Sequence, residues 1–600
     1  MTTILYPAPK RERFSIAAPW CNRLASTARS RPRGAILLGF CSLSFLLFSP
    51  TWTSPFSHLI GAPGGDQVGF FWALEWPIWA VAHGQNPLFS TYLNAPDGFN
   101  VMWTYPPLLG FLMAPVTLIA GPVFSYNLLV TLGLATSAWL MALATQRFVP
   151  HWGAAIAAGL LFGFGPYELS HALAHVVLVA QFAAPLVLLL GHEWLVRQRW
   201  RPWQVGAALG LVMAAQFLVF VESAAILVIV CAIGLIAAWL VRDHGWRRRL
   251  PYAFRSVAVA CVVFTIVCAY PLWFMLLGPQ HMTAGAVRDP GAFVSNLANF
   301  VVPTLVQLVA PSHTLTVTAG HAVDGDLVEW NAYLGIPLLI VLATVLVRCW
   351  WRERLVRFLG FTIAVIIVLS LGQRLWLTAD TPTSITLPAA LFTGVPLVEN
   401  ILWSRVAIIV DLLAAVLLAI YLHRAQGDRP LLPRSAHRPL MMVLALSLLP
   451  LFPYPSIPAP VVPAFFTSAE VQRIPAGSTA LVAPFTRNGD GIEPEYWQLA
   501  SGFRFRMTGG YVFVPGPRGP SYVLNTPLNT DMEAIALGIR GAELSGGERA
   551  EMLTELTQDH IGTVIVGPMP NRGAMVQFMT TLLGRSPQED QGVQVWWSVR

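Results

Sequence analysis

Long apolar runs separated by short polar connections dominate the chain from Gly34 to Pro453. Many of these runs are about 17–25 residues long, which is enough for an α-helix to cross a hydrocarbon core of roughly 30 Å. This pattern predicts a polytopic α-helical membrane protein with about 11 transmembrane helices. The long apolar runs stop at Pro453, so we expect the membrane part of the chain to be residues 34–453.

The pattern changes beyond residue 454, where short β-branched and aromatic runs alternate with amphipathic segments. Such alternation is typical of a small globular α/β domain, here residues 454–600. Five prolines between Pro453 and Pro463 predict an extended, semi-rigid linker before it. The expected elements are, in chain order, helix 466–473, strand 478–485, helices 531–540 and 547–559, and strands 562–566 and 593–599.

Charge decides the expected orientation in the membrane. Only 11% of the residues are charged and the net charge is +7, whereas a soluble domain carries about 25% charged residues. Residues 454–600 contain 10 Arg and 13 Asp/Glu, a net charge of −3 that leaves +10 for the rest. The basic excess lies in short connections, which the positive-inside rule assigns to the cytoplasm. Nucleic-acid binding is not needed to explain it.

The orientation predicts a basic cytoplasmic tail (1–33) and an extracytoplasmic C-terminal domain. The expected outer loops are 53–107, 278–330 and 374–402. The apolar stretch 108–120 is short and flanked by Pro and Gly, so we expect it not to span the membrane fully. The six cysteines show no disulfide framework and no zinc spacing.

Asp66 is the first candidate for chemistry. It follows the first hydrophobic segment, in an outer loop that also carries several aromatic residues. A carboxylate there is either a solvated loop charge or a catalytic base that faces a lipid-linked substrate. A base of this kind would take the proton from an acceptor hydroxyl within hydrogen-bonding reach.

Three features between residues 65 and 167 resemble the GT-C superfamily of integral-membrane glycosyltransferases. They are Gly65-Asp66 after a first helix, an aromatic segment that ends at Pro87, and Tyr105-Pro106-Pro107 before the next apolar run. The resemblance implies a GT-C-like membrane domain, a polyprenyl-phosphate sugar as donor, and Asp66 as the catalytic aspartate of the first outer loop. It hardly covers the C-terminal domain.

Arg405 and Glu329 are further candidates. Arg405 lies where an outer loop re-enters the membrane, and its planar fork suits a donor phosphate; the alternative is an interfacial arginine that snorkels. Glu329, followed by Tyr333-Leu334-Gly335, is similar to the return from loop to helix in this superfamily. Asp324 and Asp326 form an Asp-x-Asp pair, but the Trp-Trp-Asp signature of the metal-using branch is missing, so we predict no metal and no cofactor.

His171 and His175 are spaced i, i+4 and would share one helix face. The Glu of an HExxH zinc motif is absent between them. Two interpretations remain: the histidines line a polar substrate pocket with Tyr167 and Glu168, or they are structural.

Together these features favour an inverting glycosyltransferase of a bacterial plasma membrane. It would move a sugar from a polyprenyl-phosphate donor to a cell-envelope glycan or lipid on the outer face, in contact with membrane lipids. Two alternatives stay open. A transporter or flippase of a lipid-linked saccharide would show internal repeats and charged or broken helices near the midplane. A non-catalytic membrane scaffold would use the exported domain for binding.

Overall fold

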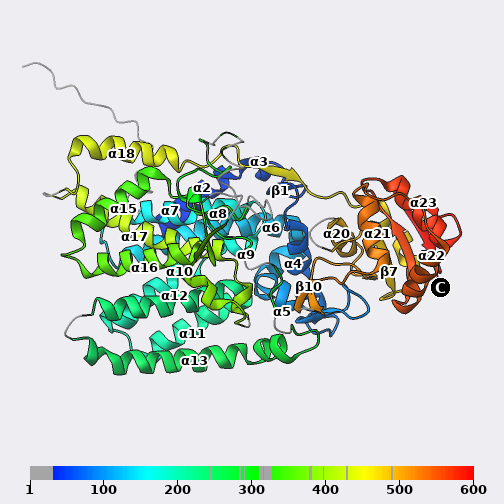
Figure 1. Cartoon of the computed structure of the whole chain (residues 1–600), viewed down its shortest axis with the longest axis horizontal. Helices are drawn as coiled ribbons and strands as arrows, with labels where there is room; N and C mark the ends of the chain where they lie inside the picture. The colour runs from blue at the N-terminus through cyan, green and yellow to red at the C-terminus, as the bar shows by residue number, and fades with distance from the viewer. Residues whose placement is uncertain are drawn as a thin grey trace, which may run out of the picture.

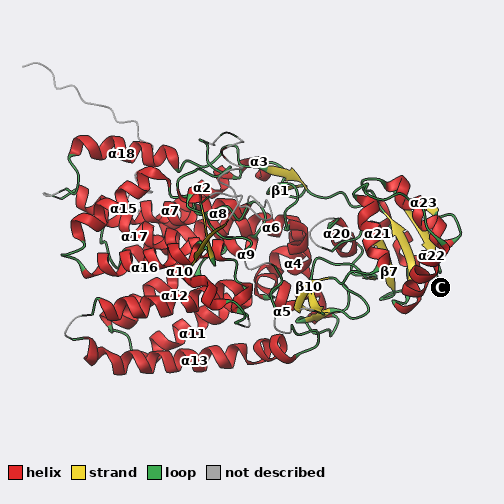
Figure 2. Ribbon diagram, viewed as in Figure 1, coloured by secondary structure: helices red, strands yellow, loops and turns green. Residues whose placement is uncertain are grey.

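The computed structural model is elongated, with a helical part at one end and a small sheet at the other (Figures 1 and 2). It describes residues 32–599 except 243–244, 283–284, 289–290, 310–311, 313–314, 316–327, 378–381, 396, 428–429, 488–490 and 518. Most of the expected tail 1–33 and the Asp324–Asp326 pair lie outside the described residues.

Long helices build the larger part. In chain order the main ones are α2 (Pro32–Leu47), α4 (Gln67–Ala82), α6 (Leu108–Thr145), α7 (Trp152–Gly163), α8 (Pro166–Ala172), α9 (Val176–Val179), α10 (Ala183–His192), the π-helix η1 (Glu193–Arg197), α11 (Pro202–Val219), α12 (Val221–Leu240), α13 (Trp246–Leu277), α15 (Gly335–Cys349), α16 (Arg354–Ser370), α17 (Ala407–Ala425) and α18 (Arg434–Ser447).

Six helical stretches among the described residues are long and apolar enough to cross a membrane. These are Leu108–Thr145, Val176–Arg197, Pro202–Val219, Val221–Leu240, Trp246–Leu277 and Trp403–Ala425. α2, α7 and α15 are apolar but shorter. The expected total of about eleven crossings is therefore not confirmed. α18 has 14 residues, or about 21 Å of helix, which is shorter than a hydrocarbon core of roughly 30 Å.

α17 is the central helix of this bundle. Every residue from Ala407 to Tyr421 is buried, because the helix is apolar on all sides except at Asp411 and other helices surround it. α7, α15 and α16 pack against it. This central position brings the N-terminal end of α17, next to Arg405, to the middle of the molecule.

The stretch 108–120 is helical, and its helix is interrupted at Gly121, within the Gly-Pro pair that follows it in the sequence. Residues 122–145 form a second helical segment, and α6 (Leu108–Thr145) spans both segments across this break. Gly121 interrupts the helical backbone with φ 79° and ψ 171°, a conformation that only glycine adopts readily. The Pro/Gly signal at this position therefore marks a break between two helical segments.

Residues beyond 478 form a five-stranded sheet in the order β12-β13-β11-β7-β8. The two central strands, β7 (Thr479–Ala483) and β11 (Ile561–Val566), are parallel and buried, as expected for apolar runs covered on both faces. The outer strands are β8 (Arg506–Met507), β12 (Gln588–Asp590) and β13 (Val593–Trp597), and the helices are α20 (Glu493–Ala500), α21 (Pro527–Ala536), α22 (Gly546–Gln558) and α23 (Arg572–Leu583).

The three expected strands and the two expected helices 531–540 and 547–559 match β7, β11, β13, α21 and α22. Helix 466–473 is instead split into α19 (Ala464–Thr467) and a 3₁₀ turn (Ala469–Arg473). α23 was not expected from the sequence. The Pro-rich segment contains β6 (Ser456–Pro458), which pairs antiparallel with β1 (His58–Ile60) of the first loop.

The aromatic segment of α4 holds the sheet region against the membrane part. Trp72 and Trp76 are fully buried and stacked, with ring centroids 5.0 Å apart. Trp72 Nε1 donates to Gln498 Oε1 of α20 at 3.1 Å, and Gln498 Nε2 donates to the Tyr92 carbonyl at 2.8 Å. Figure 1 shows α20 beside α4 at this junction. The segment 53–107, which the sequence predicts as an outer loop, thus forms an interface between the helical part and the sheet region.

Candidate active site

A cavity of about 680 Å³ lies where the helices meet the sheet region. Four predicted site residues from four distant segments line it: Asp66, His175, Glu329 and Arg405. Apolar residues of α11, α12 and α13 form one wall, and the hairpin of β9 (Phe513–Gly516) and β10 (Gly519–Tyr522) contributes to another. The cavity therefore has an apolar side among membrane helices and a polar end that contains carboxylates and an arginine.

Asp66 directly precedes α4 and is the N-cap residue of this helix. Its side chain is 26% exposed, and its Oδ2 lies 3.3 Å from Nε2 of His175. The Asp66 side chain makes no capping hydrogen bond to this helix. Asp66 thus combines a charged oxygen open to the cavity with a histidine that fixes its orientation.

His171 and His175 connect Asp66 to the protein core. Asn331 Nδ2 lies 2.9 Å from His171 Nε2 and 3.4 Å from the Val328 carbonyl, so the amide donates and His171 carries its proton on Nδ1. His171 Nδ1 then donates to His175 Nδ1 at 3.1 Å. In its neutral state His175 therefore keeps a proton on Nε2, which points to Asp66.

Arg405 is bound by two carboxylates. Its Nε and Nη2 donate to Glu329 Oε1 at 2.9 and 2.5 Å, and its Nη1 donates to Glu222. Ser404 Oγ donates to Glu329 Oε2 at 3.3 Å, and the Leu402 amide donates to Glu222 at 2.8 Å. A guanidinium has five N–H hydrogens, so two remain for another ligand.

Charges in this cluster shift the titration of His175 and Glu329. Burial opposes protonation of His175, but the hydrogen bond and negative charge of Asp66, with the charge of Glu329, outweigh it and raise its pKa. Burial also opposes ionisation of Glu329, but Arg405 and the two histidines outweigh it and hold its pKa below the ordinary value. Glu329 is therefore a carboxylate at neutral pH.

His171, His175 and Glu329 could also hold a metal ion, because one donor atom of each lies within 4.8 Å of the others. Two imidazole nitrogens and one carboxylate oxygen are suitable zinc ligands. However, the same Glu329 oxygen accepts two N–H groups of Arg405, whose positive charge repels a cation there. The expectation of no metal stays a prediction.

Tyr167, Glu168 and His171 lie behind the cavity wall rather than on it. All three are almost fully buried. The Tyr167 ring contacts the His171 ring edge-on, with centroids 4.5 Å apart. The carboxyl oxygens of Glu168 have no hydrogen-bond partner among the described residues. The geometry thus separates the predicted set into residues at the cavity and residues that support them.

Several residues at the site were not among the predicted ones. Arg288 lines the cavity and its Nη2 donates to the Tyr522 hydroxyl of β10 at 2.6 Å. Glu495 of α20 is fully buried and accepts the Tyr511 amide at 2.6 Å. Tyr511 also lines the cavity, and its carbonyl accepts the Tyr105 hydroxyl at 2.9 Å. No local pattern marks these residues, because tertiary packing alone brings them to Asp66.

The fold is similar to those of solved membrane enzymes of the GT-C superfamily. The arabinofuranosyltransferase AftD from Mycobacteria superposes with a TM-score of 0.53 at 15% identity, over 94% of this chain and 40% of that chain. The oligosaccharyltransferase AglB from Archaeoglobus fulgidus gives 0.48 at 12% identity, over 90% and 70% of the two chains. ArnT from Cupriavidus metallidurans gives 0.44 at 12% identity, over 95% and 98%.

This chain spans less than half the length of AftD. No curated protein sequence matches it. A family model described as a domain of unknown function (DUF6311) matches residues 70–398, just over half of the chain. The protein therefore belongs to the DUF6311 family, and its fold is that of the GT-C glycosyltransferases.

Proposed function

We propose that this protein is an inverting glycosyltransferase of a bacterial plasma membrane. It would move one sugar from a polyprenyl-phosphate donor to a cell-envelope glycan or lipid on the outer face. The observation that carries the proposal is the cavity that joins Asp66 and His175 to Arg405 and to an apolar wall of membrane helices. The GT-C fold supports the same reaction class, although a fold alone does not establish an activity.

In this mechanism the Asp66 carboxylate accepts the proton of the acceptor hydroxyl as its oxygen attacks the anomeric carbon. The new bond joins that oxygen to the anomeric carbon, and the bond from this carbon to the phosphate oxygen breaks. The lipid phosphate leaves with the electron pair from the opposite side, which inverts the anomeric configuration. His175 holds Asp66 in position through the 3.3 Å contact of Nε2 with Oδ2.

The donor would occupy the apolar side of the cavity. Met213, Phe217 and Phe264 of α11 and α13 line this side, and side chains of this kind suit a polyprenyl chain. The phosphate would then lie near the two remaining N–H hydrogens of Arg405, with Glu329 and Glu222 holding the guanidinium in place. Glu329 thus acts through Arg405, while Tyr167 and Glu168 support the wall.

Replacement of Asp66 by Asn tests the proposal. The amide keeps the size of the side chain but cannot accept the proton, so transfer should fall by about 10²–10⁴-fold. The assay uses the purified full-length protein, a panel of polyprenyl-phosphate sugars and cell-envelope extract as acceptor, with products identified by mass spectrometry. Asp97→Asn is the matched control, because Asp97 is an exposed residue of a loop outside the cavity.

Undiminished transfer by Asp66→Asn would eliminate the mechanism. If wild-type protein instead moves an intact lipid-linked saccharide across vesicles with no new glycosidic bond, it is a flippase. If no donor is consumed and deletion of the gene leaves the envelope glycans unchanged, the enzyme proposal fails and the scaffold interpretation replaces it.

A further inference from the structure

A second large cavity lies within the helical part, apart from the site of Asp66. Its volume is about 740 Å³, and it shares no lining residue with the first cavity. α10, η1, α12, α13, α16 and α17 surround it. Most of its wall is apolar, with Leu188, Leu227 and Phe358 among the lining residues.

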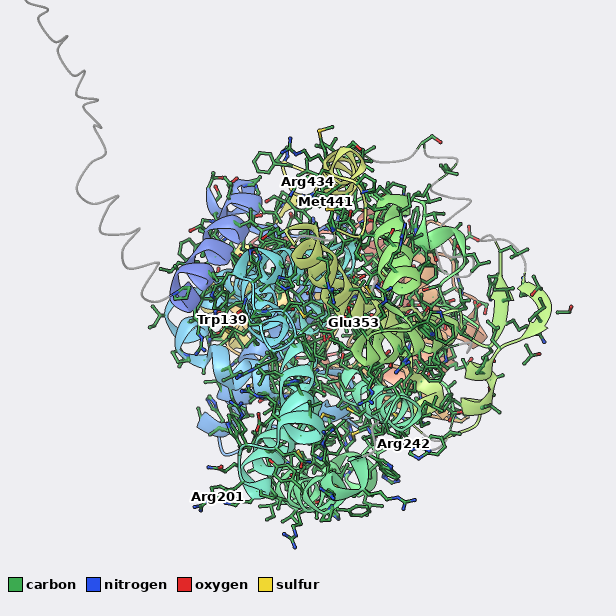
Figure 3. The ribbon with its side chains drawn as sticks, turned by 90° about the vertical axis from the view of Figure 1, so that its left-hand side faces the viewer. Trp139, Arg201, Arg242, Glu353, Arg434 and Met441 are labelled. Carbon is green, nitrogen blue, oxygen red and sulfur yellow. The ribbon has the colours of Figure 1, made fainter. Side chains whose placement is uncertain are left out.

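The charged residues of this cavity lie at the end of the molecule away from the sheet. Arg242, Arg249 and Arg354 line it, whereas the described part of its wall contains no Asp or Glu. Figure 3 views the molecule from this end and shows Arg242 together with Arg201 and Arg434. The positive-inside rule predicts that this end faces the cytoplasm.

Three tryptophans line the cavity together with these arginines. Trp194, Trp239 and Trp246 line the cavity, and tryptophan is enriched where a membrane meets water. The Arg242 guanidinium lies 4.3 Å from the centre of the Trp239 ring, and Nη1 donates to the Trp239 carbonyl at 2.7 Å. These contacts hold a positive charge at the expected depth of lipid headgroups.

The cavity is also deep enough for acyl chains. Cys231 lines it 11 residues before Arg242, which corresponds to about 16 Å along a helix. One leaflet contributes about half of a hydrocarbon core of roughly 30 Å. An acyl chain that starts near Arg242 would therefore remain in contact with the cavity wall over the depth of its leaflet.

We propose that this cavity binds one anionic phospholipid of the leaflet away from the C-terminal sheet. The acyl chains occupy the apolar interior, and the phosphate and its anionic headgroup face Arg242, Arg249 and Arg354. Charge complementarity selects the occupant, because the guanidinium groups at this end of an apolar cavity, Arg242 foremost, favour a lipid with net negative charge over a zwitterionic one. The site does not depend on the proposed sugar transfer.

Native mass spectrometry of the full-length protein tests the proposal. Purified protein in detergent is mixed with phosphatidylglycerol or with phosphatidylcholine of the same acyl chains, and bound lipid is counted after removal of the micelle. We expect one phosphatidylglycerol per protein, bound at least tenfold more tightly than phosphatidylcholine. The double variant Arg242→Gln, Arg354→Gln should lose that preference, whereas Arg434→Gln, on the same end but outside the cavity, should keep it.

A cavity-filling variant tests the position of the chains. Gly234 lines the cavity, and a Cβ added to it would meet only the Phe358 ring, at 3.9 Å. Gly234→Leu should therefore fold and reduce phosphatidylglycerol binding at least tenfold. Gly39→Leu in α2, where a Cβ also has open space, should not. Equal retention of both lipids, an unchanged affinity in Gly234→Leu, or competition by undecaprenyl phosphate for this site would overturn the proposal.

Discussion

At the scale of single residues, Glu495 shows how the C-terminal part affects the site around Asp66. Its carboxyl is buried beside Tyr511 and near Asp66. Burial, with a smaller contribution from the negative charge of Asp66, raises its pKa to about 8 despite the Tyr511 amide that it accepts. The folded protein therefore binds more protons than the unfolded chain between the ordinary pKa of a glutamate and about 8.

This difference predicts how stability depends on pH. Because the folded state holds the extra proton, stability should fall as pH rises through that window, by at most about 1.4 kcal/mol per pH unit for one proton. Glu495→Gln should remove this slope, and replacement of the exposed Glu551 by Gln should not. Thermal unfolding of detergent-solubilised protein between pH 5 and 9 measures the effect. Identical slopes in wild type and Glu495→Gln would contradict it.

His175 gives a second prediction at this scale. If it orients Asp66, His175→Gln should lower kcat by about 10²-fold, as expected for a misplaced catalytic group, and leave the KM for the donor unchanged. The exposed His83 serves as control. Steady-state kinetics with one defined donor separate the possibilities. An increase in KM with unchanged kcat would instead assign His175 to substrate binding.

At the scale of elements, the backbone break at Gly121 lets the two helical segments of α6 pack against different helices. Gly110 in the first segment lies against Ala73 and Pro77 of α4, whereas Ala138 in the second segment lies against Gly159 and Gly163 of α7. The change of direction depends on the backbone of Gly121, because its φ and ψ lie in a region that is essentially restricted to glycine.

Gly121→Ala should therefore destabilise the protein by about 1–3 kcal/mol through backbone strain alone. A Cβ at this position would meet no atom within 4 Å, so crowding does not contribute. Gly39→Ala in the middle of α2, which also has open space and no positive φ, should be neutral or slightly stabilising. Denaturation midpoints of the two variants provide the comparison. Equal midpoints would show that the kink tolerates a side chain.

At the scale of the whole molecule, charge and shape agree on an orientation. The five-stranded sheet lies at one end of the helices, and Arg201, Arg242 and Arg434 lie at the other (Figures 1 and 3). The positive-inside rule then predicts that the sheet lies outside the cell. The aromatic contacts of Trp72 and Trp76 with this region require the first loop to be on the same side.

Cysteine labelling checks this orientation. In a cysteine-free background, a membrane-impermeant maleimide should label Ser586→Cys in intact cells and Arg201→Cys only after the membrane is permeabilised. Both positions are exposed. The reverse pattern would place Asp66 on the cytoplasmic side and remove the basis for transfer to an outer-face acceptor.

The sequence by itself determined the membrane class, the change of composition near residue 454 and most strands of the sheet. These features depend on local hydrophobicity and on residue type, which nearby residues set. The motif around Gly65-Asp66 also indicated the GT-C fold, which the structure confirms. The Pro/Gly signal marked the break at Gly121, but local patterns could not show the direction in which the helical segment 122–145 continues.

Only the tertiary structure decided which charged residues meet. Asp66, His175, Glu329 and Arg405 converge from distant segments, and Glu495 of α20 lies near Asp66 without lining the cavity. The partners of Arg405, which lie 76 and 183 residues away in the sequence, and the burial of Glu495 arise from packing between distant segments. Hydrophobic patterning assigns each segment to membrane or water, but the pairing of polar groups at their junction depends on how the helices pack.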